Sequence, residues 1–209
     1  MKKLIMMLMA LCMFATATDA QNKNLEKQLK KEYKKKMKEY KAEGWKLFGS
    51  SRSLDVALLT HYDKLTTLGD DGVEVVGIAS KFKSKNVGKQ MAINNACLTY
   101  AQSAGSSVKG RVVSELSGDG IATEGEIDKF YSAYERLVEK EIKGEMKESY
   151  SIIREITPGI FELQVYYIVS ESAASQARIR AFENAAKESA AAQKYAEKIS
   201  GFVREGFEQ

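Results

Sequence analysis

The chain has 209 residues, of which 44% are apolar, so it is long enough to bury one sizeable core, and one main domain is expected. Its formal net charge is only +4, and that charge is unevenly placed. Residues 21–46 hold ten lysines and four glutamates, which leaves the chain from residue 47 onward mildly acidic. The basic character therefore belongs to one arm, and a uniformly basic domain is excluded.

Residues 1–20 have the pattern of a secretory signal peptide. A positive n-region of two lysines precedes an apolar h-region at 4–15, and Thr18 and Ala20 are small residues of the kind that signal peptidase prefers. The apolar run is too short for a comfortable membrane span. We therefore predict cleavage before Gln21 and export to the periplasm or outer cell envelope of a bacterium.

The chain has two cysteines. Cys12 lies inside the apolar run and follows Leu11, where a lipidation signal needs a small residue, so we do not expect a lipid anchor. Cleavage would leave Cys97 as the single thiol, and its alanine-rich surroundings predict a small buried hydrophobe. Because the chain also has only one histidine, the mature protein offers no His/Cys zinc site.

The arm, residues 21–46, is predicted to form a basic amphipathic helix that ends at Gly44. Its apolar residues recur every three or four positions and draw one narrow stripe among lysines. The stripe consists of Leu25, Leu29, Tyr33, Met37 and Tyr40. A stripe this thin needs a partner surface to hold the helix. The candidate contact residues are Lys30, Lys31, Tyr33, Lys34, Lys35, Lys36, Lys38 and Tyr40.

Three interpretations of the arm stay open. It is a solvated or self-associating helix, it binds an envelope component or another protein, or it makes peripheral contact with an anionic membrane. Lysine interleaved with tyrosine is also typical of nucleic-acid binding. However, the arm has no arginine to fork onto phosphates, and export removes such a partner. We therefore expect no nucleic-acid partner.

After the arm, a short apolar hinge at 44–51 leads to a helix that begins at Ser53, a residue type that suits an N-cap. The single histidine, His61, lies on this helix beside Asp63. A histidine with a nearby carboxylate is half of a catalytic pair. Residues two apart on a helix do not face each other, however. We therefore expect His61 at the surface or at the helix edge, without a catalytic role.

Strands and helices alternate in the rest of the chain. The predicted elements, in order, are a strand at 72–82, a helix at 86–107, a strand at 108–118, a helix behind a capping box at 123–126, a hairpin of two strands joined at 157–160, and a helix at 172–199. The β-branched content predicts the strands. In the hairpin, Pro158 and Gly159 suit a type II turn, which needs a positive φ at the glycine.

One alanine-rich pattern occurs twice. "MAINNACLTYAQ" at 91–102 is echoed 89 residues later by "RAFENAAKESAA" at 180–191, and each follows a predicted strand. We interpret these as two similar strand–helix units, in which alanine lets a helix lie close to a sheet. Asn95 and Asn184 occupy matching positions. They are either paired contacts to a ligand or amides that satisfy backbone groups at a sheet edge, and we expect the second role.

The order of these segments resembles the LPP-twenty lipoprotein family of bacterial envelope proteins. The resemblance rests on the "GIA" of the first strand, on "KQMAINNACLTYAQSAGSSVKGRVVSEL" and on the hairpin "SYSIIREITPGIFELQVYYIV", and it covers about residues 72–169. It implies an α+β envelope protein without established catalytic residues, so it transfers no active site. The lipid-anchor cysteine of that family is missing from this sequence.

These features predict a single α+β domain at 47–209, in which an antiparallel-rich sheet of about four strands packs against long alanine-rich helices. We predict an exported, non-catalytic binding or assembly module with no cofactor and no metal site. Two other functions stay open. A small-molecule carrier would have an apolar cavity between helices and sheet, and an enzyme of unrecognised type would have a cleft with converging ionisable groups.

Overall fold

The structure is a computed structural model that describes residues 27–116, 124–187, 200 and 203. The chain divides into two compact units, Met1–Trp45 and Lys46–Gln209. In the first unit, residues 27–42 form a helix, which is followed by Gly44 at a φ of 75°. The predicted signal peptide and the first six residues of the arm lie outside the described residues.

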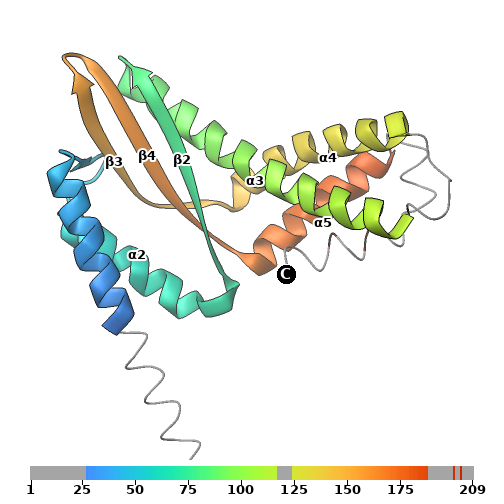
Figure 1. The fold of residues 1–209 in the computed structure, drawn as a ribbon, viewed down its shortest axis with the longest axis horizontal. Helices are drawn as coiled ribbons and strands as arrows, with labels where there is room; N and C mark the ends of the chain where they lie inside the picture. Colours follow the sequence, from blue (N-terminus) through green and yellow to red (C-terminus); the bar gives the residue numbers. More distant parts are fainter. Residues whose placement is uncertain (1–26, 117–123, 188–199, 201–202, 204–209) are drawn as a thin grey trace, which may run out of the picture. The chain divides into compact units, whose positions relative to one another are not determined.

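The second unit has the α+β fold that the sequence predicts: a four-stranded antiparallel sheet with helices on both faces (Figure 1). Its elements are the strands β1 (Lys46–Leu47), β2 (Gly72–Phe82), β3 (Lys147–Thr157) and β4 (Ile160–Ser170), and the helices α2 (Leu54–Leu68), α3 (Lys85–Leu116), α4 (Glu124–Glu145) and α5 (Glu171–Lys187). The strand order is β1-β3-β4-β2. Helix α2 covers one face of the sheet and α3 covers the other, while α4 and α5 pack against each other beside α3 (Figure 1).

The hairpin of β3 and β4, which the sequence predicts, forms the centre of the sheet. Its turn places Gly159 at a φ of 74°, the positive value that a type II turn requires at its glycine. The register is interrupted between Glu148 and Tyr150, so that Ser149 is the extra residue of a β-bulge. On the α2 face, the rings of Tyr150 and Tyr166 stack with their centroids 4.3 Å apart.

The strand predicted at 108–118 is wrong, because α3 continues through this region to Leu116. Ala101, Ala104 and Val108 are buried in one core, at the spacing that a helix requires. Their burial outweighs the β propensity of the valines that follow. The fourth strand is instead β1, from the apolar hinge, which pairs with β3.

The two strand–helix units are present as β2–α3 and β4–α5, but their helices pack differently. Helix α3 lies tight on the sheet: a Cβ atom at Gly77 would lie 1.9 Å from the carbonyl oxygen of Ala92. Helix α5 leaves the end of the sheet and runs alongside α4 (Figure 1). Its alanines, such as Ala177 and Ala181, are fully buried in the helical layer. The predicted role of alanine is therefore confirmed for α3 and wrong for α5.

The two matching asparagines also differ. The Asn95 side chain accepts a hydrogen bond of 3.0 Å from the backbone amide of Ile78, on the strand at the edge of the sheet. This confirms the expected role for Asn95. Asn184 instead accepts a hydrogen bond of 3.2 Å from Lys187, within its own helix. The two asparagines therefore occupy matching sequence positions but bond to different kinds of neighbour in the two units.

Candidate functional site

A pocket of about 510 Å³ lies at the end of the sheet where β3 begins and β4 finishes. Helix α2 supplies part of its lining, the junction between α4 and β3 supplies another part, and β4 and the start of α5 complete it. Pockets that hold small molecules usually have volumes of roughly 300–1,000 Å³. The pocket is therefore large enough to be a binding site.

Four residues near the C-terminus of α2 line the pocket: Asp63, Lys64, Thr67 and Leu68. They occupy two successive turns of the helix and so fall on neighbouring positions of its surface. The helix begins as predicted, with the Ser53 hydroxyl accepting a hydrogen bond of 3.3 Å from the amide of Val56. The local sequence therefore determines where α2 begins, and α2 supplies these four lining residues.

The sheet contributes Lys147, Ser149 and Ile168 to the lining. Lys147 and Ile168 are direct partners in the register of β3 and β4. Ser149, at the bulge, has a buried hydroxyl that finds no hydrogen-bond partner among the described residues. A buried hydroxyl without a partner costs about 1–3 kcal/mol.

Charged groups of both signs surround the pocket. Within the described part of the chain, the side chains of Asp63, Lys64 and Lys147 form no ion pair. Glu145 accepts a hydrogen bond of 2.7 Å from Arg180, so its charge is already partly balanced. Apolar atoms of Leu68, Ile168 and Ala173 belong to the same lining. This combination of apolar surface and a few polar groups is typical of a ligand-binding site.

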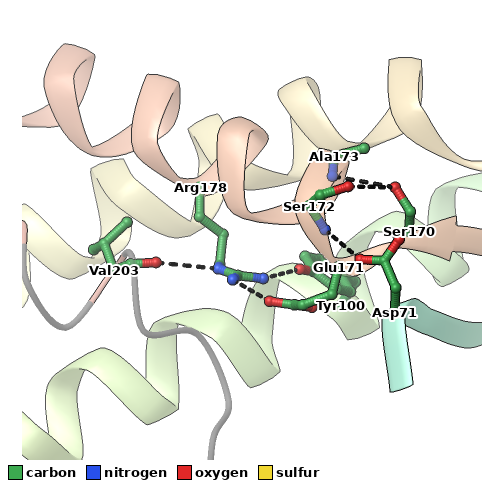
Figure 2. Close-up of polar contacts among 8 residues, drawn as sticks. All are labelled: Asp71, Tyr100, Ser170, Glu171, Ser172, Ala173, Arg178 and Val203. Atoms are coloured by element: carbon green, nitrogen blue, oxygen red, sulfur yellow. Dashed lines mark hydrogen bonds and ion pairs between the residues drawn. The ribbon is translucent and has the colours of Figure 1, made fainter. Parts of the chain in front are cut away.

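The start of α5 borders the pocket, but its first amides are occupied (Figure 2). The Ser170 hydroxyl accepts a hydrogen bond of 3.2 Å from the amide of Ala173. Asp71, from the short 3₁₀ helix Gly69–Asp71, accepts one of 3.0 Å from the amide of Ser172. A helix N-terminus often attracts an anion. Here the two protein groups already satisfy amides that would do so.

About two turns from the start of α5, Arg178 is almost fully buried, with 1% of its side chain exposed (Figure 2). Its guanidinium forms an ion pair with Glu171, donates to the Tyr100 hydroxyl at 2.6 Å and donates to the carbonyl oxygen of Val203 at 3.4 Å. Burial raises the pKa of Tyr100 to about 12, although the nearby arginine acts in the opposite direction. This network connects α5 to α3, and its partners are all protein groups.

The expectation that His61 lies at the surface is wrong. Its side chain is only 1% exposed, and its ring packs against those of Tyr150 and Tyr166 at centroid distances of 5.1 Å and 6.0 Å. The reason is that α2 turns this residue toward the sheet, where Glu74 of β2 pairs with its Nε2. No partner for its Nδ1 is found among the residues described. As expected, Asp63 is not its partner.

The contact residues predicted for the arm all lie on the helix at 27–42, in the first unit. Five of the six lysines are exposed, namely Lys30, Lys31, Lys34, Lys35 and Lys38. Lys36 is half-buried, with its ammonium 5.7 Å from the centre of the Tyr40 ring. Tyr33 is half-buried and Tyr40 is buried.

The pocket residues were not predicted from the sequence. Asp63 and Lys64 look like ordinary residues of a solvated helix face, and Lys147 and Ser149 lie more than 80 positions away. The bulge at Ser149 has no marker such as glycine or proline in the sequence. What joins these residues is the pairing of β3 with β4 and the crossing of α2 over them.

The fold and the pocket define an α+β domain with a candidate small-molecule site. No protein-family model matches the chain, and comparisons with curated proteins and with solved structures find no match either. Across residues 27–116 and 124–187, no helix is long and apolar enough to cross a bilayer. The same described residues contain no group of three or more His, Cys, Asp or Glu side chains arranged to hold a metal ion.

Proposed function

We propose that this protein is an exported, non-catalytic binding module of the bacterial envelope, and that its α+β domain takes up a small molecule in the pocket beside α2. The observation that carries the proposal is the pocket of about 510 Å³, whose lining joins apolar side chains to charged groups that form no ion pair among the described residues. Most buried polar groups in native proteins are hydrogen-bonded. Ser149, a residue of the same lining, has a buried hydroxyl without a partner among the described residues.

The sequence supports the location in this proposal. Residues 1–20 have the n-region, h-region and cleavage residues of a secretory signal. The resemblance to the LPP-twenty family points to the same compartment and to a protein without established catalytic residues. Cell fractionation of the native protein, with processing at Gln21 checked by mass spectrometry, tests the location. A full-length product in the cytosol would contradict it.

Methyl NMR of the purified full chain tests the pocket. A library of small amphipathic compounds is added, and the methyl signals of Leu68 and Ile168 report binding because both side chains line the pocket. We expect some compounds to shift these signals and to leave the Val56 methyls unchanged, since Val56 is exposed elsewhere on α2. If no compound of any charge class shifts them, the proposed function is wrong.

A pair of neighbouring threonines on α2 provides a matched control. Thr67 lines the pocket and Thr66 does not, yet both are exposed and both hydroxyls donate to the carbonyl oxygen four residues earlier at 2.8 Å. Thr67→Trp places an indole in the pocket, and we expect it to abolish the ligand-induced shifts. Thr66→Trp should preserve them. Equal effects of the two variants would show that the compounds bind elsewhere.

The exposed lysines of the arm favour a second role, attachment to an anionic envelope component. Lys30, Lys31, Lys34, Lys35 and Lys38 lie on one short helix and are exposed to solvent. Such a basic surface is attracted to anionic surfaces, and the attraction weakens as salt is added. Changing the five lysines to glutamate should release the protein from the envelope fraction. Unchanged retention would remove the arm from the proposal.

A further inference from the structure

We infer that the ligand of the pocket is a small zwitterion with an apolar portion, of the kind represented by an apolar dipeptide with free termini. The inference rests on the proposed function, since it names the chemistry of the same site. It follows from which charged groups around the pocket already have partners and which do not.

Unpaired groups of both signs face the pocket. Lys64 from α2 and Lys147 from the start of β3 provide two ammonium groups, and Asp63 provides a carboxylate. Among the described side chains, none of the three has an ion-pair partner. A purely anionic ligand would bring its charge close to Asp63, and a purely cationic ligand would meet two lysines. A ligand with one charge of each sign avoids both repulsions.

The fourth charged group limits the choice further. Glu145 is bonded to Arg180 at 2.7 Å, and Arg180 also binds Glu141 at 2.7 Å. Glu145 is therefore a weaker attractor for a cation than Asp63. The available charge is two ammonium groups against one full carboxylate, which suits a ligand carboxylate near the lysines and a ligand ammonium near Asp63.

The rest of the lining fits the uncharged part of such a molecule. Leu68, Ile168 and Ala173 offer apolar surface for an aliphatic side chain. Ser149 belongs to the same lining, and its hydroxyl, which has no partner among the described residues, is of a kind that can donate to or accept from a peptide group. The first amides of α5 are bonded to Ser170 and Asp71, so the carboxylate is assigned to the lysines rather than to this helix end.

Four forms of one dipeptide separate the contributions of the two charges. Calorimetry of the full chain would compare leucyl-leucine, its N-acetyl form, its amide and its doubly capped form, which share the same side chains. We expect the zwitterion to bind about tenfold more tightly than either singly charged form, because each capped end loses one charge-assisted contact. The doubly capped form should bind most weakly.

Two variants assign the charges to residues. Lys147→Ala should weaken the zwitterion and the N-acetyl form and should not weaken the cationic amide. Asp63→Asn should weaken the zwitterion and the amide and should not weaken the anionic N-acetyl form. Lys83→Ala is the control, because Lys83 is exposed and does not line the pocket; it should change none of the four affinities. Thermal unfolding of each variant would check that it is folded.

The outcomes separate this inference from the function on which it rests. A capped form that binds as tightly as the zwitterion, and is blocked by Thr67→Trp, overturns the zwitterion and leaves the binding pocket standing. The inference also fails if none of the four forms binds while other compounds shift the Leu68 and Ile168 methyls. If no compound of any charge class shifts them, both the inference and the proposed function fail.

Discussion

The two faces of the sheet are packed in opposite ways. On the α3 face, small residues bring helix and strand into backbone contact, as at Gly77 and Ala92. On the α2 face, large rings separate the layers: His61 packs against Tyr150 and Tyr166, whose rings stack on each other. Because protein interiors are close-packed, small residues allow a helix to lie nearer to the sheet than large rings do. The pocket lining includes Ser149, which precedes Tyr150 in β3, and Ile168, which is two residues from Tyr166 in β4.

The two faces therefore have different roles: one contributes most of the buried core, and the other carries the candidate binding site. The α3 face and the helices beyond it, which we call the closed side, contain most of the buried core. The α2 face, which we call the open side, contains the pocket and a buried hydroxyl without a partner in the described chain. Binding sites are commonly built on a rigid scaffold in this way. Pairs of substitutions at residues of the same type, placed in different surroundings, test this contrast.

The largest effect is expected for Arg178 on the closed side. Arg178→Met removes the buried partner of the Glu171 carboxylate and one partner of the Tyr100 hydroxyl. Because the Glu171 side chain is itself 33% exposed, we expect a loss of about 3–4 kcal/mol, toward the lower end for breaking a buried ion pair. Arg180→Met, two residues along the same helix, removes an arginine that is 41% exposed and should cost less than about 1 kcal/mol. Urea unfolding measures both. Equal losses in the free energy of unfolding would show that the burial of Arg178 adds nothing to its contribution to stability.

The second largest effect is expected at Gly77. Gly77→Ala places a methyl group 1.9 Å from the Ala92 carbonyl oxygen, a backbone atom that moves only with its helix. We expect the free energy of unfolding to fall by about 3 kcal/mol, at the upper end for overpacking. Gly110→Ala, in α3 where nothing lies within 4 Å, should instead raise it by about 0.5–1 kcal/mol through helix propensity. A harmless Gly77→Ala would contradict the close contact.

Two serines on β3 compare the two sides directly. Ser149→Ala removes the unpartnered hydroxyl of the open side and should raise the free energy of unfolding of the ligand-free protein by about 1 kcal/mol. Ser151 faces the closed side, where its hydroxyl bonds to Glu148, so Ser151→Ala should lower that free energy by about 1 kcal/mol. Chemical denaturation measures the signs. A loss on Ser149→Ala without ligand would show that its hydroxyl already has a partner.

The sequence predicts which segments form helices and strands better than it predicts which of these elements pack together. The hairpin at Pro158 and Gly159, the strand at 72–82 and the helix start at Ser53 follow from local chemistry, and all three are confirmed. The strand expected at 108–118 fails because Val108 belongs to a core that forms only when α3, α4 and α5 pack together. Local propensity cannot report such a distant contact.

The candidate site depends even more on distant contacts. His61 looks like a surface residue until β2 brings Glu74 to it, and Ser149 looks like any strand residue until the register slips beside it. No spacing within α2 indicates that Lys64 shares a pocket with Lys147. The arm is the opposite case, because its lysines are visible in the sequence and their partner stays a prediction. Charge patterns are local, whereas pockets are made by tertiary packing.

The smallest effect concerns the reactivity of a thiol. It tests whether reagents are kept out of the core on the closed side. Cys97 is buried in the core, as the sequence predicts, and burial raises the pKa of its thiol above the ordinary value, with a nearby lysine acting in the opposite direction. At pH 8 little thiolate forms, so a thiol reagent should react slowly with the native protein and fully in denaturant. Because the pKa is higher in the folded state, the protonated thiol stabilises the fold at low pH. That contribution should be lost as the pH rises past the ordinary thiol range.

Thr67→Cys in a Cys97→Ala background places the thiol on the open side, where Thr67 is exposed, and it should react at the rate of a free thiol. A native Cys97 that reacts as fast as this variant would mean that α3 separates readily from the sheet, and the contrast between the two faces would fail.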